Sequence, residues 1–141
     1  MEDKFLPLSQ VQYTKQQLKD TQILVLSFVG DAVHTLYVRT KLVQQNPYDN
    51  NELHKLTSKE VCAESQAKFV SIIEPMLDED ELFILKKGKN AKVNTVPKHA
   101  KLYDYKLATA FEALVGYLYL LGNNERLNQI FEIIYKGEDK C

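Results

Sequence analysis

The sequence predicts an all-α fold, and three observations lead to this prediction. Residues 22–45 form an apolar stretch without proline that is too long for one strand, and a second apolar stretch covers residues 108–121. Only four prolines and five glycines occur in 141 residues. No alternating apolar and polar run of strand length is present. With 45% apolar and 26% charged residues, the chain has the composition of one globular domain with a core of its own.

Five helices are expected along this domain. They cover, in order, residues 21–45, 51–73, 78–89, 103–121 and 125–136. Asp20 or Thr21 caps the first helix, and Pro47 among asparagine and aspartate residues predicts the loop that follows it. Leucine, valine and isoleucine at roughly helical spacing give the second helix an apolar face, and Pro75 ends or bends it.

Charge and turn residues define the remaining elements. The acidic residues 78–81 begin the third helix at the positive end of its dipole, and three lysines end it at the negative end. Gly122 and two asparagines predict the turn between the last two helices. We expect residues 1–20 to be a polar lead-in, residues 21–136 to be the folded domain, and residues 137–141 to fray.

Each of the two apolar stretches contains a single carboxylate, Asp31 in the first and Glu112 in the second. Desolvating an ionised carboxylate costs several kcal/mol unless it is paired or binds a metal. Gly30 and Gly116 lie close to these acids, and a missing Cβ lets another backbone approach. We therefore expect the two helices to pack against each other near the glycines, which brings Asp31 and Glu112 together.

Two carboxylates cannot neutralise each other, so such a pair needs a cation. Arg39 and Lys106 are the obvious internal cations on these helices. A divalent ion from solvent would resolve the repulsion, and an all-oxygen ligand set favours Mg²⁺ or Mn²⁺ over Zn²⁺. Mg²⁺ usually takes one or two protein carboxylates, keeps waters and binds substrate phosphate. The alternative is that one acid caps a helix or forms a salt bridge, while the other is exposed at a helix edge.

A basic segment separates the third and fourth helices. Residues 86–101 contain six lysines and His99 but no acid, whereas the rest of the chain has twelve basic residues against nineteen acids. Such a positive segment is typical of a surface that attracts an anionic partner such as nucleic acid. Three of these lysines also favour a helix C-terminus, so the alternative is a solvated helix end followed by a plain loop.

Cysteine usage and hydropathy bear on where the protein works. Cys62 and Cys141 form neither a disulfide framework nor a zinc motif, so free thiols are expected. The first twenty residues have no apolar signal region, and no apolar run is expected to reach the length of a membrane span. We therefore expect a cytoplasmic protein without membrane partners.

Four motifs, in the right order along the chain, resemble those of the ribonuclease III family. They are Phe28-Val-Gly-Asp-Ala-Val33, Lys86-Lys-Gly-Lys-Asn-Ala-Lys92, Thr95-Val-Pro-Lys98, and the stretch 105–116 with Thr109-Ala-Phe-Glu-Ala-Leu-Val-Gly116. The resemblance covers about residues 20–135 and is greatest to short bacterial members, which lack the double-stranded-RNA-binding domain usually appended in the family. It implies that residues 21–136 are a catalytic domain.

The resemblance implies the ribonuclease III endonuclease fold in a homodimer, and an endoribonuclease that cleaves double-stranded RNA with Mg²⁺, or Mn²⁺ in its place. The products would carry 5′-phosphate and 3′-hydroxyl ends. In the short members the implied substrate is precursor 23S ribosomal RNA, which a ribosomal protein could present. By position, Asp31 and Glu112 would be the catalytic metal ligands, and Phe28 would lie at the dimer seam. The implied RNA contacts are Lys86, Lys87, Lys89, Asn90, Lys92 and Lys98.

The chain departs from the family pattern at three positions. Ser27 and Leu24 stand where full-length members have further carboxylates before the signature aspartate, and Thr109 stands where they have another aspartate. Two protein carboxylates per site remain, and Ser27 and Thr109 could hold metal-bound waters. Because no double-stranded-RNA-binding domain is expected in this chain, the catalytic dimer itself or a partner would have to hold the substrate.

Two other functions stay open on the sequence alone. The same fold could be a non-catalytic RNA-binding or ribosome-assembly module, which would bind RNA without cutting it at any Mg²⁺ or Mn²⁺ concentration. A helical structural or protein-interaction domain would instead pair its acids internally and use its lysines only for solubility. That domain would show no salt-sensitive affinity for RNA.

Overall fold

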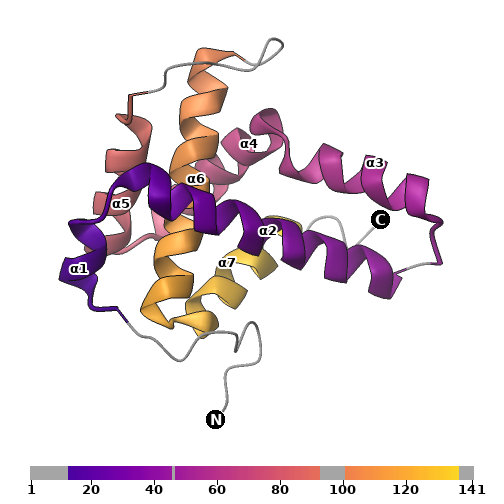
Figure 1. Cartoon of the computed structure of the whole chain (residues 1–141), viewed down its shortest axis with the longest axis horizontal. Coiled ribbons are helices and arrows are strands. Elements are labelled where there is room, and N and C mark those ends of the chain that lie inside the picture. Colours follow the sequence, from indigo (N-terminus) through magenta and orange to yellow (C-terminus); the bar gives the residue numbers. More distant parts are fainter. Residues whose placement is uncertain (1–12, 46, 93–100, 137–141) are drawn as a thin grey trace.

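The computed structural model describes residues 13–45, 47–92 and 101–136, and all regular secondary structure within these ranges is helical (Figure 1). The elements are α1 (Lys15–Lys19), α2 (Ile23–Gln45), α3 (Asn50–Val61), α4 (Ala63–Ile73), the 3₁₀ turn η1 (Glu74–Met76), α5 (Glu79–Lys89), α6 (Leu102–Leu121) and α7 (Asn124–Tyr135). The all-α prediction is confirmed. The expected fraying of residues 137–141 and most of the N-terminal lead-in lie outside the described residues.

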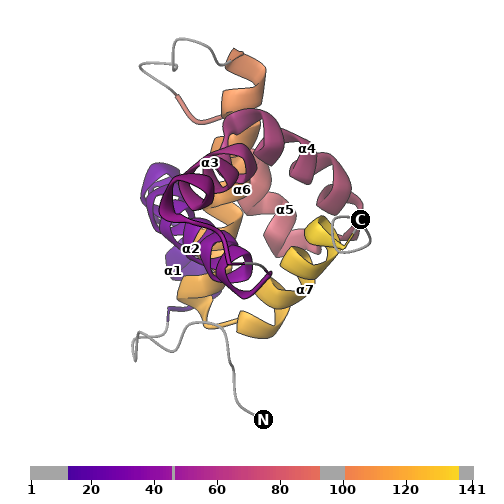
Figure 2. The same cartoon turned by 90° about the vertical axis from the view of Figure 1, so that its right-hand side faces the viewer.

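Helix α6 is the centre of the fold. Its residues from Leu107 to Leu118 are buried, with the exception of the half-buried Glu112. Helix α2 crosses α6 and makes the most extensive contact with it, while α4 and α5 pack on the rest of its surface (Figures 1 and 2). Full burial of a large apolar side chain such as Phe111 contributes roughly 1.5–3 kcal/mol. The core is therefore built around the helix that carries one of the two predicted site carboxylates.

Helices α2 and α6 cross at two glycines. A Cβ on Gly30 would overlap the backbone carbonyl of Glu112, and a Cβ on Gly116 would overlap that of Leu26. The same Cβ positions lie 2.8 Å from the amide nitrogen of Gly116 and 3.0 Å from that of Gly30. Backbones this close leave no room for a side chain. The predicted packing of the two helices near their glycines is confirmed.

The single helix expected over residues 51–73 is wrong, because the structure divides it into α3 and α4. Cys62 has an extended backbone (φ −73°, ψ 160°) between them. The carbonyl of Lys59, near the end of α3, accepts a hydrogen bond from Ser65 Oγ at 2.7 Å. This hydrogen bond satisfies a backbone carbonyl at the end of α3, so the helix can end without proline or glycine. The apolar spacing in the sequence continues through the break and does not reveal it. As a result α3 runs alongside α2, whereas α4 packs on α6.

Short polar motifs and turn residues set the ends of α4, α5 and α6 as predicted. The expected cap of the first helix is wrong, because α2 begins at Ile23 and the Thr21 hydroxyl donates instead to the Gln17 carbonyl. Asp78 caps α5, and its side chain and that of Glu81 form a reciprocal capping box. Pro75 lies in η1, immediately after α4. Gly122 ends α6 in the left-handed conformation with φ 83°. The boundaries of the remaining helices agree with the expected ranges to within one or two residues.

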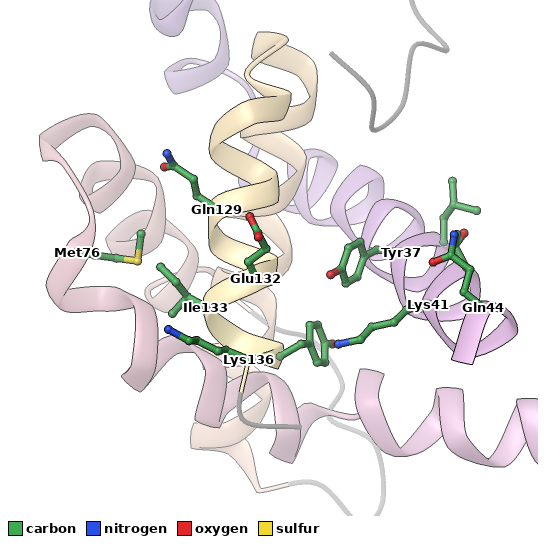
Figure 3. Close-up of a pocket in the computed structure, with 11 residues that line it drawn as sticks. Tyr37, Lys41, Gln44, Met76, Gln129, Glu132, Ile133 and Lys136 are labelled. Carbon is green, nitrogen blue, oxygen red and sulfur yellow. The ribbon is translucent and has the colours of Figure 1, made fainter. Parts of the chain in front are cut away.

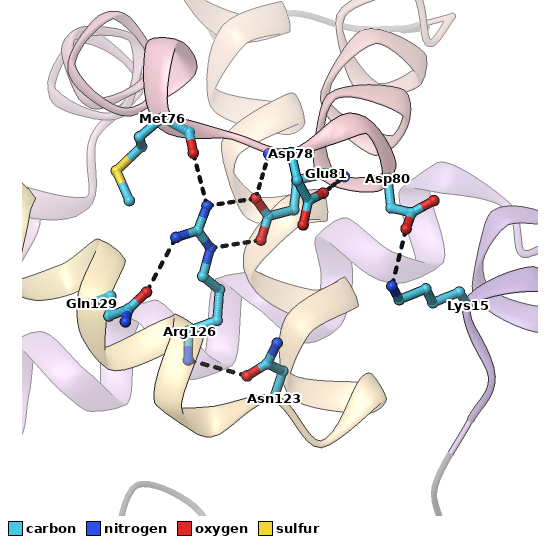
Figure 4. A network of polar contacts seen from close by, with 8 residues as sticks. All are labelled: Lys15, Met76, Asp78, Asp80, Glu81, Asn123, Arg126 and Gln129. Carbon is cyan, nitrogen blue, oxygen red and sulfur yellow. Dashed lines mark hydrogen bonds and ion pairs between the residues drawn. The ribbon is translucent and has the colours of Figure 1, made fainter.

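A partly buried ion pair joins α5 to α7 (Figure 4). Arg126 donates through Nε to Glu81 Oε2 and through a terminal nitrogen to Oε1, both at 2.7 Å, and that nitrogen also donates to the carbonyl of Met76. Burial raises the pKa of Glu81, but the hydrogen bonds from Arg126 and the Asp78 backbone more than offset it and hold the pKa below its usual value. Removing Arg126 would leave the buried Glu81 carboxylate without its charged partner, which is strongly unfavourable, so this contact holds α7 in place.

By length and composition alone, α2 could cross a membrane, and it is the one such helix in the described ranges. This corrects the expectation that no apolar run reaches that length. The inward face of α2, which includes Leu26, His34 and Val38, is packed on other helices, mainly α6. Of the apolar window in α2, 39% is buried in this packing.

Candidate active site

Asp31 and Glu112 meet where α2 crosses α6. Asp31 follows Gly30 and is exposed, whereas Glu112 is half-buried and lies one turn before Gly116. The two carboxyl groups are close enough for a hydrogen bond between them. The structure thus brings together the two acids that the glycines were expected to bring together, and their role as metal ligands stays a prediction.

The environment of this pair favours a proton on Glu112. Burial, followed by the charge and hydrogen bond of Asp31, raises the pKa of Glu112 from 4.5 to about 8. Hydrogen bonds from Gln66 and Ser27 lower this pKa, but by less. Without a cation, the pair therefore holds a proton at neutral pH. A divalent ion between the two groups would displace that proton and neutralise both charges.

Both carboxylate oxygens of Glu112 accept hydrogen bonds from neighbouring helices. Ser27 Oγ donates to Oε1 and Gln66 Nε2 donates to Oε2, each at 3.3 Å. Ser27 is a buried residue of α2, one turn before Asp31. Gln66 is a buried residue of α4. Nothing in the sequence singles out Gln66, because it is 46 residues from Glu112 and only the packing of α4 on α6 brings the two together.

Thr109 lies one turn before Glu112 on the same helix and is buried. Its hydroxyl donates to the carbonyl of Tyr105 at 3.0 Å, so its hydrogen is used within α6. Its oxygen keeps lone pairs that could accept a hydrogen bond from a metal-bound water, and the same holds for Ser27. The proposed water-holding role of both residues is compatible with this geometry and stays a prediction.

The available donors suit a hard divalent cation. Within the described ranges, no group of three or more histidine, cysteine, aspartate or glutamate residues gathers in a way that could hold a metal. An ion at Asp31 and Glu112 would therefore have two protein carboxylates, with waters and substrate phosphate as its other ligands. Mg²⁺ and Mn²⁺ accept such a set, whereas a catalytic Zn²⁺ site normally has three protein ligands.

Two lysines of the basic segment form contacts within the protein. Lys87 Nζ donates to the backbone carbonyls of Lys19 and Thr21 at 2.7 and 3.2 Å, which ties the end of α5 to the end of α1. Lys89 pairs with Glu74 at 2.9 Å. Both side chains thus have a structural role within the protein. To contact RNA as predicted, Lys87 and Lys89 would have to give up these contacts.

Three other members of the segment are available to a partner. Lys86, Asn90 and Lys92 are exposed at the end of α5, and Lys98 lies outside the described residues. A Cβ on Gly88 would lie 2.5 Å from Cα of Ala110, so the end of α5 packs tightly beside the part of α6 that leads to Glu112. The exposed lysines therefore lie near the N-terminal half of α6, the helix that carries Glu112.

An apolar surface lies next to Asp31 on α2. Phe28 is 79% exposed, and Leu24 and Val25 are each almost half exposed. A large apolar side chain this exposed, beside two other exposed apolar side chains, is typical of a surface that a partner covers. We refer to Leu24, Val25 and Phe28 as the α2 patch.

A hollow lies away from the two carboxylates, between α2 and α7 (Figure 3). Its volume is about 820 Å³, and its lining includes Tyr37 and Lys41 of α2 and Glu132 of α7. Neither Asp31 nor Glu112 contributes to it. Pocket size therefore does not point to the two carboxylates, and their identification depends on chemistry and geometry.

The family model for the Ribonuclease III domain matches residues 24–123, which include both carboxylates and the helix crossing. The chain therefore belongs to the ribonuclease III family, and it is an endoribonuclease of the ribonuclease III type. The resemblance inferred from the four motifs is confirmed.

Similar proteins within the family include bacterial proteins named Mini-ribonuclease 3. The chain is 48% identical over 120 residues to the Mini-ribonuclease 3 of a Thermoanaerobacter species, covering 85% of this chain and 84% of that protein. It is 42% identical over 124 residues to the Mini-ribonuclease 3 of Clostridium tetani, covering 87% and 82%. A crystal structure of a Fusobacterium nucleatum protein matches with a TM-score of 0.78 and 37% identity, over 86% of this chain and 98% of that one.

Proposed function

We propose that the protein cleaves double-stranded RNA with the help of a divalent cation held by Asp31 and Glu112. The observation that carries this proposal is the contact between the two carboxyl groups at the α2–α6 crossing, where burial and Asp31 raise the pKa of Glu112 to about 8. A close acid pair of this kind is costly unless a cation or a shared proton compensates it. Bound there, Mg²⁺ or Mn²⁺ would supply charge neutralisation at the scissile phosphate and a more acidic water.

The protein's own part in this reaction is to present two oxygen ligands in a fixed geometry. Asp31 reaches the site from the exposed side of α2, and Glu112 reaches it from α6 with both oxygens already hydrogen-bonded. No side-chain nucleophile is needed for hydrolysis that leaves 5′-phosphate and 3′-hydroxyl ends. His34, three residues after Asp31, is unsuited to act as a base: burial lowers its pKa to about 3, and both ring nitrogens have partners.

A homodimer completes the proposal, because both strands of a duplex must be cut. The resemblance implies that Phe28 lies at the dimer seam, and the α2 patch offers an apolar surface there beside Asp31. A twofold axis through this patch would place one site against each strand. Lys86 and Lys92 would bind phosphates outside the site, with Asn90 between them.

We propose precursor 23S ribosomal RNA as the substrate and the cytoplasm as the location. Both rest on the resemblance of the four motifs to the short bacterial members of the family. A ribosomal protein that presents the RNA would compensate for a small catalytic surface. Naked precursor and precursor bound by ribosomal proteins can be compared directly as substrates.

The test is cleavage of a labelled RNA duplex and of precursor 23S ribosomal RNA in Mg²⁺, in Mn²⁺ and in EDTA. We expect metal-dependent cuts on both strands with 5′-phosphate ends from the wild type. Asp31→Asn and Glu112→Gln should bind RNA but not cut it, while Glu132→Gln, which changes an exposed carboxylate on α7, should cut normally. Undiminished cutting in EDTA or by Asp31→Asn would contradict the proposal.

A further inference from the structure

A continuous chain of hydrogen bonds runs through the protein interior to Glu112. Tyr135 Oη lies 2.7 Å from His34 Nε2, and Gln66 Nε2 lies 3.1 Å from His34 Nδ1 and 3.3 Å from Glu112 Oε2. The four residues come from α7, α2, α4 and α6. Successive members are between 32 and 101 residues apart in sequence, so only the folded protein assembles the chain.

The donors and acceptors present allow only one direction for each hydrogen bond in this series. The amide nitrogen of Gln66 has two hydrogens and cannot accept, so it donates one to the Glu112 carboxylate and one to His34 Nδ1. His34 must then be unprotonated at Nδ1 and carry its hydrogen on Nε2, which donates to Tyr135 Oη. Burial keeps His34 neutral by lowering its pKa to about 3, so Nδ1 is an acceptor at every physiological pH.

His34 is held so firmly that it can act as a fixed anchor. It is fully buried, and its ring packs edge-on against Phe69 and Phe111 with centroid distances of 5.9 and 5.1 Å. The same ring stacks with Phe131 and Tyr135 at 5.8 and 6.2 Å. Rings on three helices therefore fix the position of the acceptor that Gln66 must reach.

We propose that Gln66 is a positioning residue for Glu112, and that His34 orients the Gln66 amide. The Glu112 side chain has three rotatable bonds. Without a partner for Oε2, its carboxylate would be free to turn away from a cation. The amide group of Gln66, a residue that is 2% exposed, is bound to a fixed acceptor on one side and to Oε2 on the other, and so removes that freedom. Hydrogen-bonded partners of this kind typically change metal affinity about 10–100-fold when they are removed.

This inference rests on the proposed role of Glu112 as a metal ligand, so the test separates the two claims. Mn²⁺ binding is measured by the loss of the free-ion electron paramagnetic resonance signal, in the absence of RNA. We expect Gln66→Leu to bind Mn²⁺ about 10–100-fold more weakly than the wild type. His34→Phe keeps an aromatic ring but removes the acceptor for Gln66, and we expect a smaller loss in the same direction.

Cleavage then gives a signature that a general packing defect would not give. Added Mn²⁺ should restore the kcat of Gln66→Leu toward that of the wild type, and KM for the RNA duplex should not change. Thr57→Val is the matched control, because it removes another buried polar group, a hydroxyl that donates to the Leu53 carbonyl on α3. We expect its Mn²⁺ affinity to equal that of the wild type. Circular dichroism shows which variants are folded.

Wild-type Mn²⁺ affinity in Gln66→Leu or in His34→Phe, whichever folds, would overturn the positioning role. A loss of activity in Gln66→Leu that Mn²⁺ cannot restore would also overturn it. Asp31→Asn and Glu112→Gln are titrated beside these variants. If those two bind Mn²⁺ like the wild type, the proposed metal site itself fails, whereas weakened binding in them alone leaves the site standing without the role of Gln66.

Discussion

Gly30 on α2 and Gly116 on α6 lie backbone against backbone, so that a Cβ on the first would be 2.8 Å from the amide nitrogen of the second. Asp31 directly follows Gly30, and Glu112 precedes Gly116 by one turn. Closing the two helices at their glycines therefore sets the two carboxyl groups side by side. A contact in the core of the fold thus determines the geometry of the candidate active site.

Gly30→Ala should cost far more stability than Gly122→Ala. The new methyl group of Gly30→Ala would overlap the carbonyl of Glu112 and force α2 away from α6, and overpacking costs about 1–3 kcal/mol or more. We expect a loss of at least about 3 kcal/mol. Gly122 has φ 83° at the end of α6, where alanine costs about 1–2 kcal/mol. Urea unfolding followed by circular dichroism measures both, and equal losses would contradict the tight crossing.

The stability of the metal-free protein should fall as pH rises from about 6.5 to about 8. In this window the folded protein keeps a proton on Glu112, whose pKa is about 8, while the unfolded chain has lost it at a pKa near 4.5. The free energy of unfolding decreases with pH wherever the folded state holds more protons. His34 acts in the opposite direction, but only between about pH 3 and pH 6.5.

Urea unfolding in EDTA across this pH range measures the effect. Glu112→Gln has no proton to lose and should not show the fall, so the difference between the two proteins isolates this one group. The same fall in the variant as in the wild type would show that another residue causes it.

The lysines of the basic segment should separate into two classes. Lys86→Ala and Lys92→Ala remove exposed charges, so each should weaken duplex RNA binding and lower the slope of log affinity against log salt by about 0.9 per lost phosphate contact. Lys87→Ala leaves two carbonyls without their charged donor, so we expect about 1–3 kcal/mol less stability and little change in the salt slope. Gel-shift titrations in the Asp31→Asn background avoid cleavage. Identical behaviour of the three variants would contradict this division.

Phe28→Asp should produce a folded monomer. A charge in the centre of the α2 patch would have to be buried without a partner in the dimer, and that is strongly unfavourable. Analytical ultracentrifugation should show the change in mass, with circular dichroism unchanged and cutting of both strands lost. Tyr103→Asp is the control, because Tyr103 is 72% exposed at the start of α6, outside the patch. A Phe28→Asp dimer would contradict the proposed seam.

Local sequence features predicted most helices and the meeting of the two acids. Pro75, Gly122 and the acids at 78–81 act within one helical turn, so their effects could be read directly. The glycines also led to a correct prediction, because a missing Cβ close to a single acid in an apolar helix has few explanations. The two glycines could be linked although they lie on different helices, because the close approach of α2 and α6 needs a glycine on each helix.

What the sequence did not reveal depends on contacts between distant residues. The break at Cys62 is stabilised by a side chain on the next helix, and serine there has no distinctive pattern. Gln66 and His34 look like ordinary polar residues on amphipathic helices until α4 and α7 pack around α6. The contacts of Lys87 with the end of α1 were hidden for the same reason. Polar partners in a helical core follow from the tertiary packing.

Mn²⁺ titration of the wild type, Asp31→Asn and Glu112→Gln, with cleavage of an RNA duplex followed in the same samples, decides whether these two carboxylates hold the catalytic ion. For the wild type we predict saturable binding that releases a proton near neutral pH, because the ion displaces the proton held by Glu112. Each variant should lose at least about 100-fold in affinity and in cleavage together. Wild-type binding and cleavage in either variant would contradict a metal site at Asp31 and Glu112.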